Sequence, residues 1–143
     1  MYLIDTDVLS ALRRRDRNVA VAHWAASIAP HDLHISVATV NEVEHGIQRL
    51  KSRDPAHAES LTIWINKVIA EFGERALPVT VPIARRWACI SATLGYDDLD
   101  LAIAATALEH NLVVVTRNVR DFTRTGAAIY DPFEGKTYSA KKV

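Results

Sequence analysis

The most constraining feature of this chain is a short apolar run, Leu-Val-Val-Val-Thr at positions 112–116. Side chains of a strand point alternately to its two faces, so this run predicts a strand that is covered on both sides, as in a parallel sheet. Strand-like segments alternate with helical patterns elsewhere, and right-handed crossovers keep such strands parallel. We therefore predict an α/β fold: a single domain with a central, mostly parallel sheet of about five strands flanked by helices.

The expected elements follow the apolar periodicity and the turn residues. Strands are expected at residues 2–4, 33–37, 76–79, 112–116 and 127–130. Helices are expected at residues 7–14, 19–28, 39–50, 55–73, 82–94 and 98–110, with a helical turn at 119–122. We expect one domain at residues 1–133 and a tail at 134–143, with loose order from residue 131 onward.

The composition excludes several classes of protein. Seventeen basic and 17 acidic side chains give a net charge of zero, so any nucleic acid must be met by a local basic patch. The single cysteine, Cys89, excludes an internal disulfide and a cysteine-built zinc site, and we expect it to be a small buried residue. No apolar run reaches the roughly 18 residues of a membrane span, and Asp5 and Asp7 interrupt any signal peptide. We expect a cytoplasmic protein without membrane contact.

Four acidic residues far apart in the sequence are expected at one edge of the sheet: Asp5, Glu42, Asp100 and Asp121. In parallel sheets the ligand site lies beyond the carboxyl ends of the strands. Asp5 ends the first expected strand, and Glu42 lies in the first turn of the helix after the second. Asp121 follows the strand that ends at Thr116, and the helix that begins near Asp100 leads back into that strand. All four acids therefore point to the carboxyl edge.

Each acid also has a structural explanation. Glu42 stands three residues after Thr39, the spacing of a capping box, in which the carboxylate accepts a backbone hydrogen bond. Asp100 and Asp121 lie near helix starts, where the helix dipole favours negative charge. Asp5 is harder to explain in this way, because a carboxylate that ends an apolar strand is costly to bury unless it is paired or binds a cation.

Several carboxylates gathered in one cleft repel one another unless a cation neutralises them. Mg²⁺ and Mn²⁺ take oxygen ligands and keep several waters, so one or two direct carboxylates suffice. An ion held in this way lowers the pKa of a bound water and offsets charge on a phosphoryl oxygen. The sequence contains no Gly-x-Ser-x-Gly elbow, no phosphate-binding loop and no His-Glu-x-x-His motif. The pattern favours metal-dependent phosphate chemistry.

Four segments carry a family resemblance: Leu-Ile-Asp-Thr-Asp-Val-Leu-Ser at 3–10, Ser-Val-Ala-Thr-Val-Asn-Glu-Val-Glu-His-Gly at 36–46, Asp-Leu-Ala-Ile-Ala-Ala-Thr-Ala-Leu at 100–108 and Val-Thr-Arg-Asn-Val-Arg-Asp-Phe at 115–122. Together they resemble the PIN-domain family, and more closely the VapC-type toxins of bacterial toxin–antitoxin pairs, including the FitB-like branch. The resemblance extends over residues 2–133, in the order and spacing of the family.

This resemblance implies a metal-dependent endoribonuclease that cleaves structured RNA, commonly transfer RNA or ribosomal RNA, with a metal-activated water. The acids of the family that bind Mg²⁺ or Mn²⁺ and support catalysis match Asp5, Glu42, Asp100 and Asp121. The resemblance also implies a homodimer that is held inactive by a VapB- or FitA-like antitoxin. DNA is contacted only through that antitoxin.

Other polar residues surround these acids in the sequence. Thr6 and Asn118 match polar positions beside the acids of the family. Asp7 stands where the family often has Asn, which adds negative charge to the site. Asp97 and Asp98 add further charge, and the sequence leaves open whether either of them touches a metal.

Two groups of arginines are candidates for contacting RNA phosphates. The first follows the first helix and the second follows the last core strand: Arg13, Arg14, Arg15 and Arg17, and Arg117, Arg120 and Arg124. Alternatively, these side chains are solvated, complement a helix C-terminus or bind acidic groups of an antitoxin. Arg117 is the candidate substrate-binding residue among them.

The sequence leaves two other functions open. Tyr-Leu-Ile-Asp-Thr-Asp-Val-Leu also fits the first motif of haloacid-dehalogenase-like phosphatases, with Asp5 as the covalent nucleophile and Asp7 as the general acid. Against this, no lysine stands in a convincing second position, and Glu42 is left unexplained. The other alternative is a catalytically inactive module that binds RNA or protein, against which the intact set of four acids argues.

Overall fold

The computed structural model describes residues 1–140. Its centre is a six-stranded sheet in the order β3-β2-β1-β4-β5-β6, in which all neighbouring strands are parallel except β5 and β6. The strands are β1 (Tyr2–Ile4), β2 (Leu33–Ser36), β3 (Ala76–Leu77), β4 (Val113–Val115), β5 (Ile129–Asp131) and β6 (Lys136–Tyr138). The predicted α/β fold with a mostly parallel sheet is confirmed.

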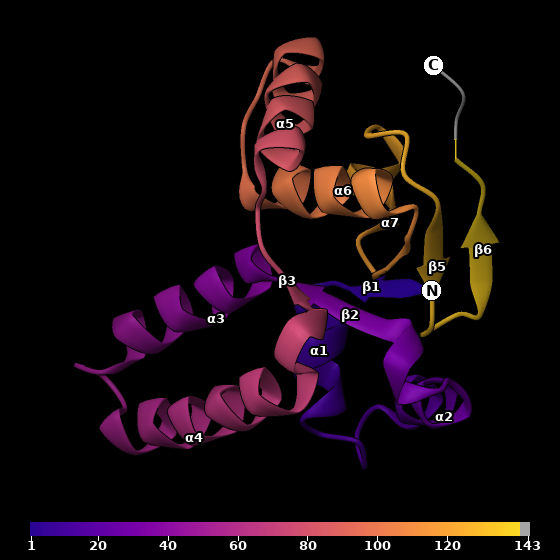
Figure 1. The fold of residues 1–143 in the computed structure, drawn as a ribbon. Coiled ribbons are helices and arrows are strands. Elements are labelled where there is room, and N and C mark those ends of the chain that lie inside the picture. Colours follow the sequence, from indigo (N-terminus) through magenta and orange to yellow (C-terminus); the bar gives the residue numbers. More distant parts are fainter. Residues whose placement is uncertain (141–143) are drawn as a thin grey trace.

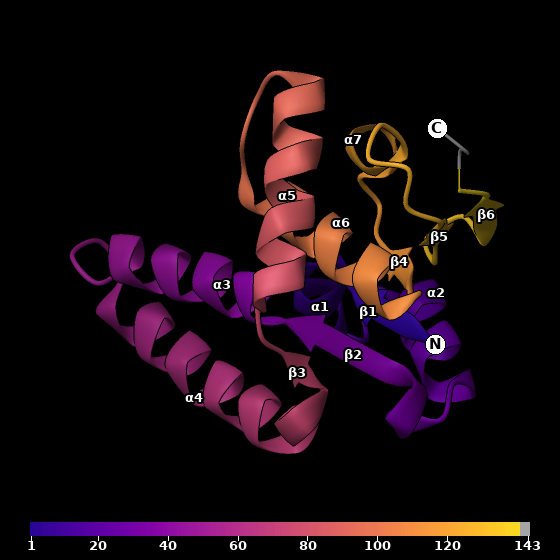
Figure 2. The same cartoon turned by 45° about the horizontal axis from the view of Figure 1, so that its top comes forward.

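Helices connect the strands and cover both faces of the sheet (Figure 1). They are α1 (Thr6–Leu12), α2 (Val19–Ser27), α3 (Val37–Leu50), α4 (Pro55–Phe72), α5 (Val81–Leu94), α6 (Leu99–His110) and α7 (Val119–Thr123), with 3-10 turns η1 (Pro30–Asp32) and η2 (Gly73–Arg75). Figure 2 shows α3 and α4 lying side by side and extending away from the sheet. None of the helices within residues 1–140 is long and apolar enough to cross a membrane.

Neighbouring residues of β1 point to opposite faces of the sheet and belong to different buried clusters. Leu3 belongs to a buried cluster that includes Phe122, whereas Ile4 belongs to a second cluster that includes Val8 and Ile65. Figure 1 accordingly shows α5, α6 and α7 on one side of the strands, and α1, α2 and α4 on the other. This alternation is the one expected of a strand that is covered on both sides.

Helix α6 packs against the sheet through a middle that is built largely from small apolar residues. All residues from Leu101 to Ala107 are buried. Four of these seven are alanines, whose short side chains let the helix approach the strands closely. The helix begins after Asp98, whose carboxylate accepts a hydrogen bond from the N–H of Leu101 at 3.2 Å. Its first turn, which carries Asp100, is thereby fixed above the carboxyl ends of the strands.

The sixth strand corrects the expectation of loose order from residue 131. Asp131 is buried, and its Oδ1 accepts the N–H of Phe133 at 2.9 Å. Gly135, with a positive φ of 68°, completes the turn that brings β6 back along β5. The turn residues and the β-forming Thr137 and Tyr138 explain this strand. It lies within the predicted 134–143 tail, and residues 141–143 lie outside the described residues.

Two further local expectations were wrong. Helix α3 begins at Val37 rather than at Thr39, because Oγ of Ser36 accepts the N–H of Ala38 at 3.0 Å. Glu42 therefore lies beyond the first turn and is not part of a capping box with Thr39. Cys89 is exposed rather than buried, because α5 buries only Ile83.

Candidate active site

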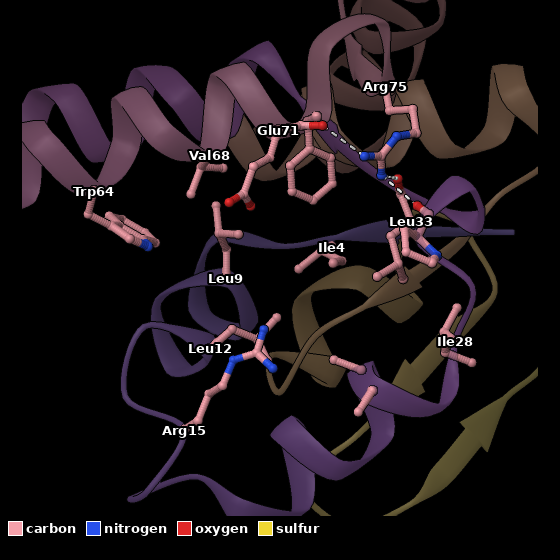
Figure 3. Close-up of a pocket in the computed structure, with 14 residues that line it drawn as sticks. Ile4, Leu9, Leu12, Arg15, Ile28, Leu33, Trp64, Val68, Glu71 and Arg75 are labelled. Atoms are coloured by element: carbon pink, nitrogen blue, oxygen red, sulfur yellow. Dashed lines mark hydrogen bonds between the residues drawn. The ribbon is translucent and has the colours of Figure 1, made fainter.

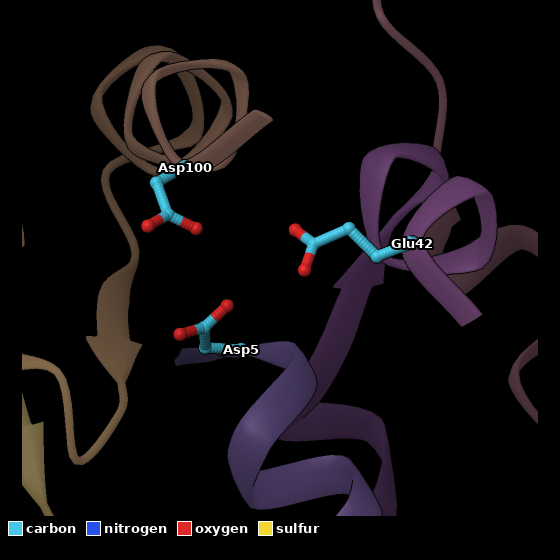
Figure 4. Close-up of side chains that lie close together, drawn as sticks. All are labelled: Asp5, Glu42 and Asp100. Carbon is cyan, nitrogen blue, oxygen red and sulfur yellow. The ribbon is translucent and has the colours of Figure 1, made fainter. Parts of the chain in front are cut away.

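Three of the four predicted acids converge at the carboxyl edge of the sheet. Asp5, Glu42 and Asp100 each offer one carboxylate oxygen, and these oxygens lie within 4.8 Å of one another. Figure 4 shows the three side chains pointing toward a common space from three different elements. Asp5 directly follows β1, Glu42 projects from α3, and Asp100 projects from the first turn of α6. Residues up to 95 positions apart in the sequence thus share one site.

Asp5 is the most tightly held of the three. Its backbone N–H extends the parallel pairing by donating to the carbonyl of Val115 at 2.9 Å. Its Oδ1 accepts the N–H of Thr6 at 2.7 Å and so caps α1. Its Oδ2 accepts the hydroxyl of Thr116 at 2.8 Å. With both oxygens bound and only 4% of its surface exposed, the carboxylate has a fixed orientation.

Thr116 is a residue of the site that the sequence analysis did not single out. Its Oγ1 lies 2.8 Å from Oδ2 of Asp5, whereas both carboxylate oxygens of Asp7 lie farther away, at 3.4 Å. Its Oγ1 in turn accepts the N–H of Asn118 at 2.9 Å. The available indication was its position: it is the polar residue that ends the most apolar strand, at the same edge as Asp5. The hydroxyl therefore links the loop after β4 to the loop after β1.

Asp7 holds the same two loops together through backbone contacts. Its Oδ1 accepts the N–H of Val8 at 2.7 Å, and its Oδ2 accepts the N–H of Arg117 at 3.0 Å. Burial raises the pKa of Asp7, although these hydrogen bonds and the charge of Arg117 act in the opposite direction. Asp7 thus lies beside the three converging acids and is turned toward the backbone. This orientation does not suit the general acid of a phosphatase.

Asp121 lies outside the three-acid cluster and is connected to it by Asn118. The side-chain amide of Asn118 donates to Oδ2 of Asp121 at 2.9 Å and lies 3.4 Å from Oδ2 of Asp100. Asp121 itself is exposed. The structure therefore places the fourth predicted acid beside the cluster, with one amide spanning the two carboxylates.

The remaining predicted polar residues have structural contacts. The hydroxyl of Thr6 donates to that of buried Thr39 at 3.2 Å and joins α1 to α3. Asp98 caps α6, and Asp97 accepts the indole N–H of Trp87 at 2.7 Å. Asp97 and Asp98 do not belong to the three-acid cluster within residues 1–140.

The acids raise one another's pKa values. Burial, followed by the charge of Asp7, raises the pKa of Asp5 from its ordinary 3.8 to about 7. Burial, followed by the charge of Asp98, raises the pKa of Asp100 from 3.8 to about 6. Burial and the charge of Asp100 also raise the pKa of Glu42. The cluster therefore favours either bound protons or a bound cation at neutral pH.

The donor set fits a hard divalent cation. Oε1 of Glu42 is buried and has no hydrogen-bond partner among the described residues, and Figure 4 shows the carboxylate that carries it facing Asp5 and Asp100. Within residues 1–140, no ion pair involves any of these acids. All three converging ligand atoms are carboxylate oxygens, the type that Mg²⁺ and Mn²⁺ prefer.

The two arginine groups lie in different places. Arg13 ends α1, and its Nη2 lies 3.4 Å from Nε2 of His57 on α4, whereas Arg15 lines a cavity beside that helix. By contrast, Arg117 directly follows Thr116, and its guanidinium carbon lies 3.6 Å from the centre of the Phe133 ring. Of these three arginines, Arg117 is therefore the one placed beside the acids.

Comparisons with known proteins agree with this geometry. The PIN domain family matches residues 2–128. The toxin FitB of Neisseria gonorrhoeae is 31% identical, over 93% of this chain and 99% of that protein. The VapC ribonuclease Y4jK of Sinorhizobium fredii is also 31% identical, over 94% and 99%.

A solved structure shows the same fold. The crystal structure of FitAcB from Neisseria gonorrhoeae superposes with a TM-score of 0.80 at 31% identity, covering 93% of this chain and 99% of that chain. These matches extend along nearly the whole length of the chain. This chain belongs to the PIN domain family.

Proposed function

We propose that this protein is a metal-dependent endoribonuclease and the toxin of a toxin–antitoxin pair. The observation that carries the proposal is the convergence of Asp5, Glu42 and Asp100 around a space into which Glu42 directs an unpartnered buried oxygen. Relatives at 31% identity are named a toxin and a VapC ribonuclease, which supports RNA as the substrate. The proposed substrate is structured RNA, with transfer RNA or ribosomal RNA as the candidates.

We propose that Asp5, Glu42 and Asp100 hold Mg²⁺ or Mn²⁺, with Asp121 acting beside them. When bound, such an ion lowers the pKa of a coordinated water and offsets negative charge on a phosphoryl oxygen. The protein's own contribution is orientation. Thr116 fixes the carboxylate of Asp5, and Asn118 holds Asp121 next to Asp100.

The roles of the other polar residues are supporting. Thr6 fixes α1 against α3, and therefore Asp5 against Glu42. Asp7 fixes the loop that carries Thr116 and Asn118. The residues named here lie on three segments, so a displacement of any one segment would spread the carboxylates apart. They are Asp5, Thr6, Asp7, Glu42, Thr116 and Asn118. A displacement of about 1 Å is enough to lower the rate of a positioned reaction strongly.

We propose a VapB- or FitA-like antitoxin as the protein partner. Similar solved structures at 30–31% identity are FitAcB, and FitAB bound to a DNA fragment. By this analogy, the present chain would contact DNA only through its antitoxin. We further propose a homodimer that acts in the cytoplasm.

The decisive experiment incubates purified, antitoxin-free protein with total bacterial RNA in Mg²⁺, in Mn²⁺ or in a chelator. Discrete fragments are expected with metal, and none with the chelator or with Asp5→Asn. Asp16→Asn is the matched control, because it removes one exposed carboxylate outside the site and is expected to leave cleavage intact. Intact RNA under every metal condition, from protein with the wild-type melting profile, would overturn the proposal.

The two alternative functions predict different results in binding and labelling assays. An inactive binding module would retain RNA without cutting it. A phosphatase would form an acid-stable phospho-aspartate at Asp5, whereas the nuclease forms none. Membership of the PIN domain family and the backbone-facing Asp7 favour neither alternative.

A further inference from the structure

One cation at the rim of the acidic site is held by an aromatic ring from the C-terminal hairpin. The guanidinium carbon of Arg117 lies 3.6 Å from the centre of the Phe133 ring, which is stacking distance. Arg117 follows β4 directly, and Phe133 lies in the turn between β5 and β6. The contact therefore joins the loop beside the acids to a segment that the sequence analysis assigned no role.

The polar edge of the Arg117 guanidinium is available for a ligand. Within residues 1–140, Arg117 forms no side-chain hydrogen bond and no ion pair, although its loop lies beside the acidic cluster of Asp5, Glu42 and Asp100. Its backbone N–H donates to Asp7, and its carbonyl accepts the N–H of Val119 at 2.9 Å. The residue is exposed. Its backbone is thus fixed while the hydrogen-bonding edge of the guanidinium stays available.

The ring beneath it is also fixed. The N–H groups of Phe133 and Glu134 lie 2.9 and 3.4 Å from Oδ1 of buried Asp131. The N–H of Gly135 donates to the carbonyl of Asp131 at 2.8 Å. Phe133 itself packs against the buried cluster that contains Ile4. A stacked guanidinium on such a support loses less freedom when it binds a ligand than a free arginine does.

We propose that Phe133 positions the Arg117 guanidinium to bind a phosphate of the RNA strand beside the acidic site. This inference rests on the proposed ribonuclease function, because it assigns the contact to that enzyme's substrate. A phosphate is favoured over a base, since the ring face on which a base would stack is already covered by Arg117. The planar guanidinium also matches the oxygens of a phosphate in a paired geometry.

The test measures RNA binding without cleavage. The variants are made in the Asp5→Asn background, and the anisotropy of fluorescein-labelled bulk transfer RNA is measured over a range of salt concentrations. Arg117→Ala is expected to raise Kd roughly tenfold. The slope of log Kd against log salt should fall by about 0.7 to 1, the loss of one phosphate contact. Arg53→Ala, which removes an exposed arginine from the remote turn between α3 and α4, should change neither value (Figure 2).

The positioning role of Phe133 has its own signature. Phe133→Leu keeps an apolar side chain on the core but removes the ring, and it should raise Kd roughly two- to fivefold with little change in salt slope. Phe133→Tyr should restore wild-type binding. In the double variant, Phe133→Leu should add nothing to Arg117→Ala, because it acts only through the arginine. A merely structural role for Phe133 would give additive losses.

Each outcome decides the inference. Unchanged affinity and salt slope in Arg117→Ala would overturn it, and would leave the guanidinium available to an acidic group of a partner protein. Additive effects in the double variant would overturn the role of Phe133. Because binding is measured in a background that does not cleave, failure of the ribonuclease proposal is distinguishable: wild-type protein would then leave RNA intact while the binding variants still behaved as described.

Discussion

Consecutive residues of one strand end serve opposite purposes in this protein. Ile4 is 1% exposed and packs in an apolar layer with Val8, Ile35 and Ile65, whereas its neighbour Asp5 is 4% exposed and faces other carboxylates. We call these regions the apolar layer and the acidic site. Burial stabilises the apolar layer, whereas it raises the cost of charge in the acidic site, where Asp5 is buried and Glu42 and Asp100 are half-buried. Stability and activity should therefore be separable by substitution.

The apolar layer also continues into a cavity on the side of α1 away from the acids. This cavity of about 380 Å³ is lined by Leu9 and Leu12 of α1 and by Trp64 and Val68 of α4 (Figure 3). It contains the side chains of Arg15, Glu71 and Arg75 as well. The acidic site lies at the beginning of α1 and the cavity along its length, so one short helix borders both regions.

The largest expected effect is a loss of activity without a loss of stability when one carboxylate of the acidic site is replaced. Asp100→Asn should lower RNA cleavage by about a thousandfold or more, because a ligand for the cation is lost. The melting temperature in chelator should stay similar or rise, since a buried charge beside Asp98 and Asp121 is removed. Cleavage rates and thermal melts of the same preparation measure both quantities. A fall of several degrees in the melting temperature would show that Asp100 is structural.

A substitution in the apolar layer is expected to do the reverse, lowering stability without lowering activity. Ile65 is fully buried, so Ile65→Ala should lower the free energy of unfolding by about 3 kcal/mol. Cleavage per folded molecule should be unchanged at a temperature where the variant remains folded. Urea unfolding curves measure the free energy of unfolding, and cleavage rates corrected for the active fraction measure the activity per folded molecule. Loss of activity without loss of stability would break the distinction between the two regions.

The pH dependence of stability sharpens the contrast further. The pKa of Asp5 is raised from 3.8 to about 7 and that of Asp100 to about 6, so the folded chain binds these protons more tightly than the unfolded chain. Their stabilising contribution is present at about pH 4 and is lost as the pH rises toward 7. Without metal, the melting temperature should therefore fall by roughly 5 °C or more between pH 5 and pH 7.5.

This pH effect has an internal control. Asp5→Asn should flatten the profile, and adding Mn²⁺ to the wild-type protein should raise its melting temperature most at the upper end of the range. If the melting temperature of the protein without metal rises across the same interval, the raised pKa values of Asp5 and Asp100 would be contradicted.

The smallest expected effect concerns the hydroxyl that connects the two strand ends. Thr116→Val removes the hydrogen bond to Asp5, which should cost about 1–2 kcal/mol of stability. That hydrogen bond lowers the pKa of Asp5, so its loss should raise the pKa and move the acid limb of the pH–rate profile upward. Thr116→Ser keeps the hydroxyl and should restore both properties. Identical profiles for Val and Thr would remove Thr116 from the site.

The topology made much of the site predictable. Once the run at 112–116 indicated a parallel sheet, the rule that ligands bind at the carboxyl edge placed Asp5, Glu42 and Asp100 together without any spacing motif. The position of Asp121 was less predictable, because it depends on how the loop after β4 folds. Asn118, which connects it to Asp100, sets that geometry through side-chain contacts.

Other features depended on contacts that no local pattern records. The spacing of Thr39 and Glu42 matches a capping box, but α3 is capped inside the chain segment that was expected to be a strand, where Oγ of Ser36 accepts the N–H of Ala38. The partnership of Arg117 with Phe133 requires β5 to lie beside β4, after which the turn brings the ring back over the loop. Cys89 is exposed because it lies on the face of α5 that is turned away from the core, which the sequence around it does not record.

Titration calorimetry with Mn²⁺ measures whether Asp5, Glu42 and Asp100 together hold a divalent cation. Wild-type protein and Asp16→Asn should bind Mn²⁺ with the same affinity. Asp5→Asn, Glu42→Gln and Asp100→Asn should each weaken binding by roughly tenfold or more. Equal affinity in all five proteins would contradict this assignment, because the carboxylates of Asp5, Glu42 and Asp100 would then contribute nothing to Mn²⁺ binding.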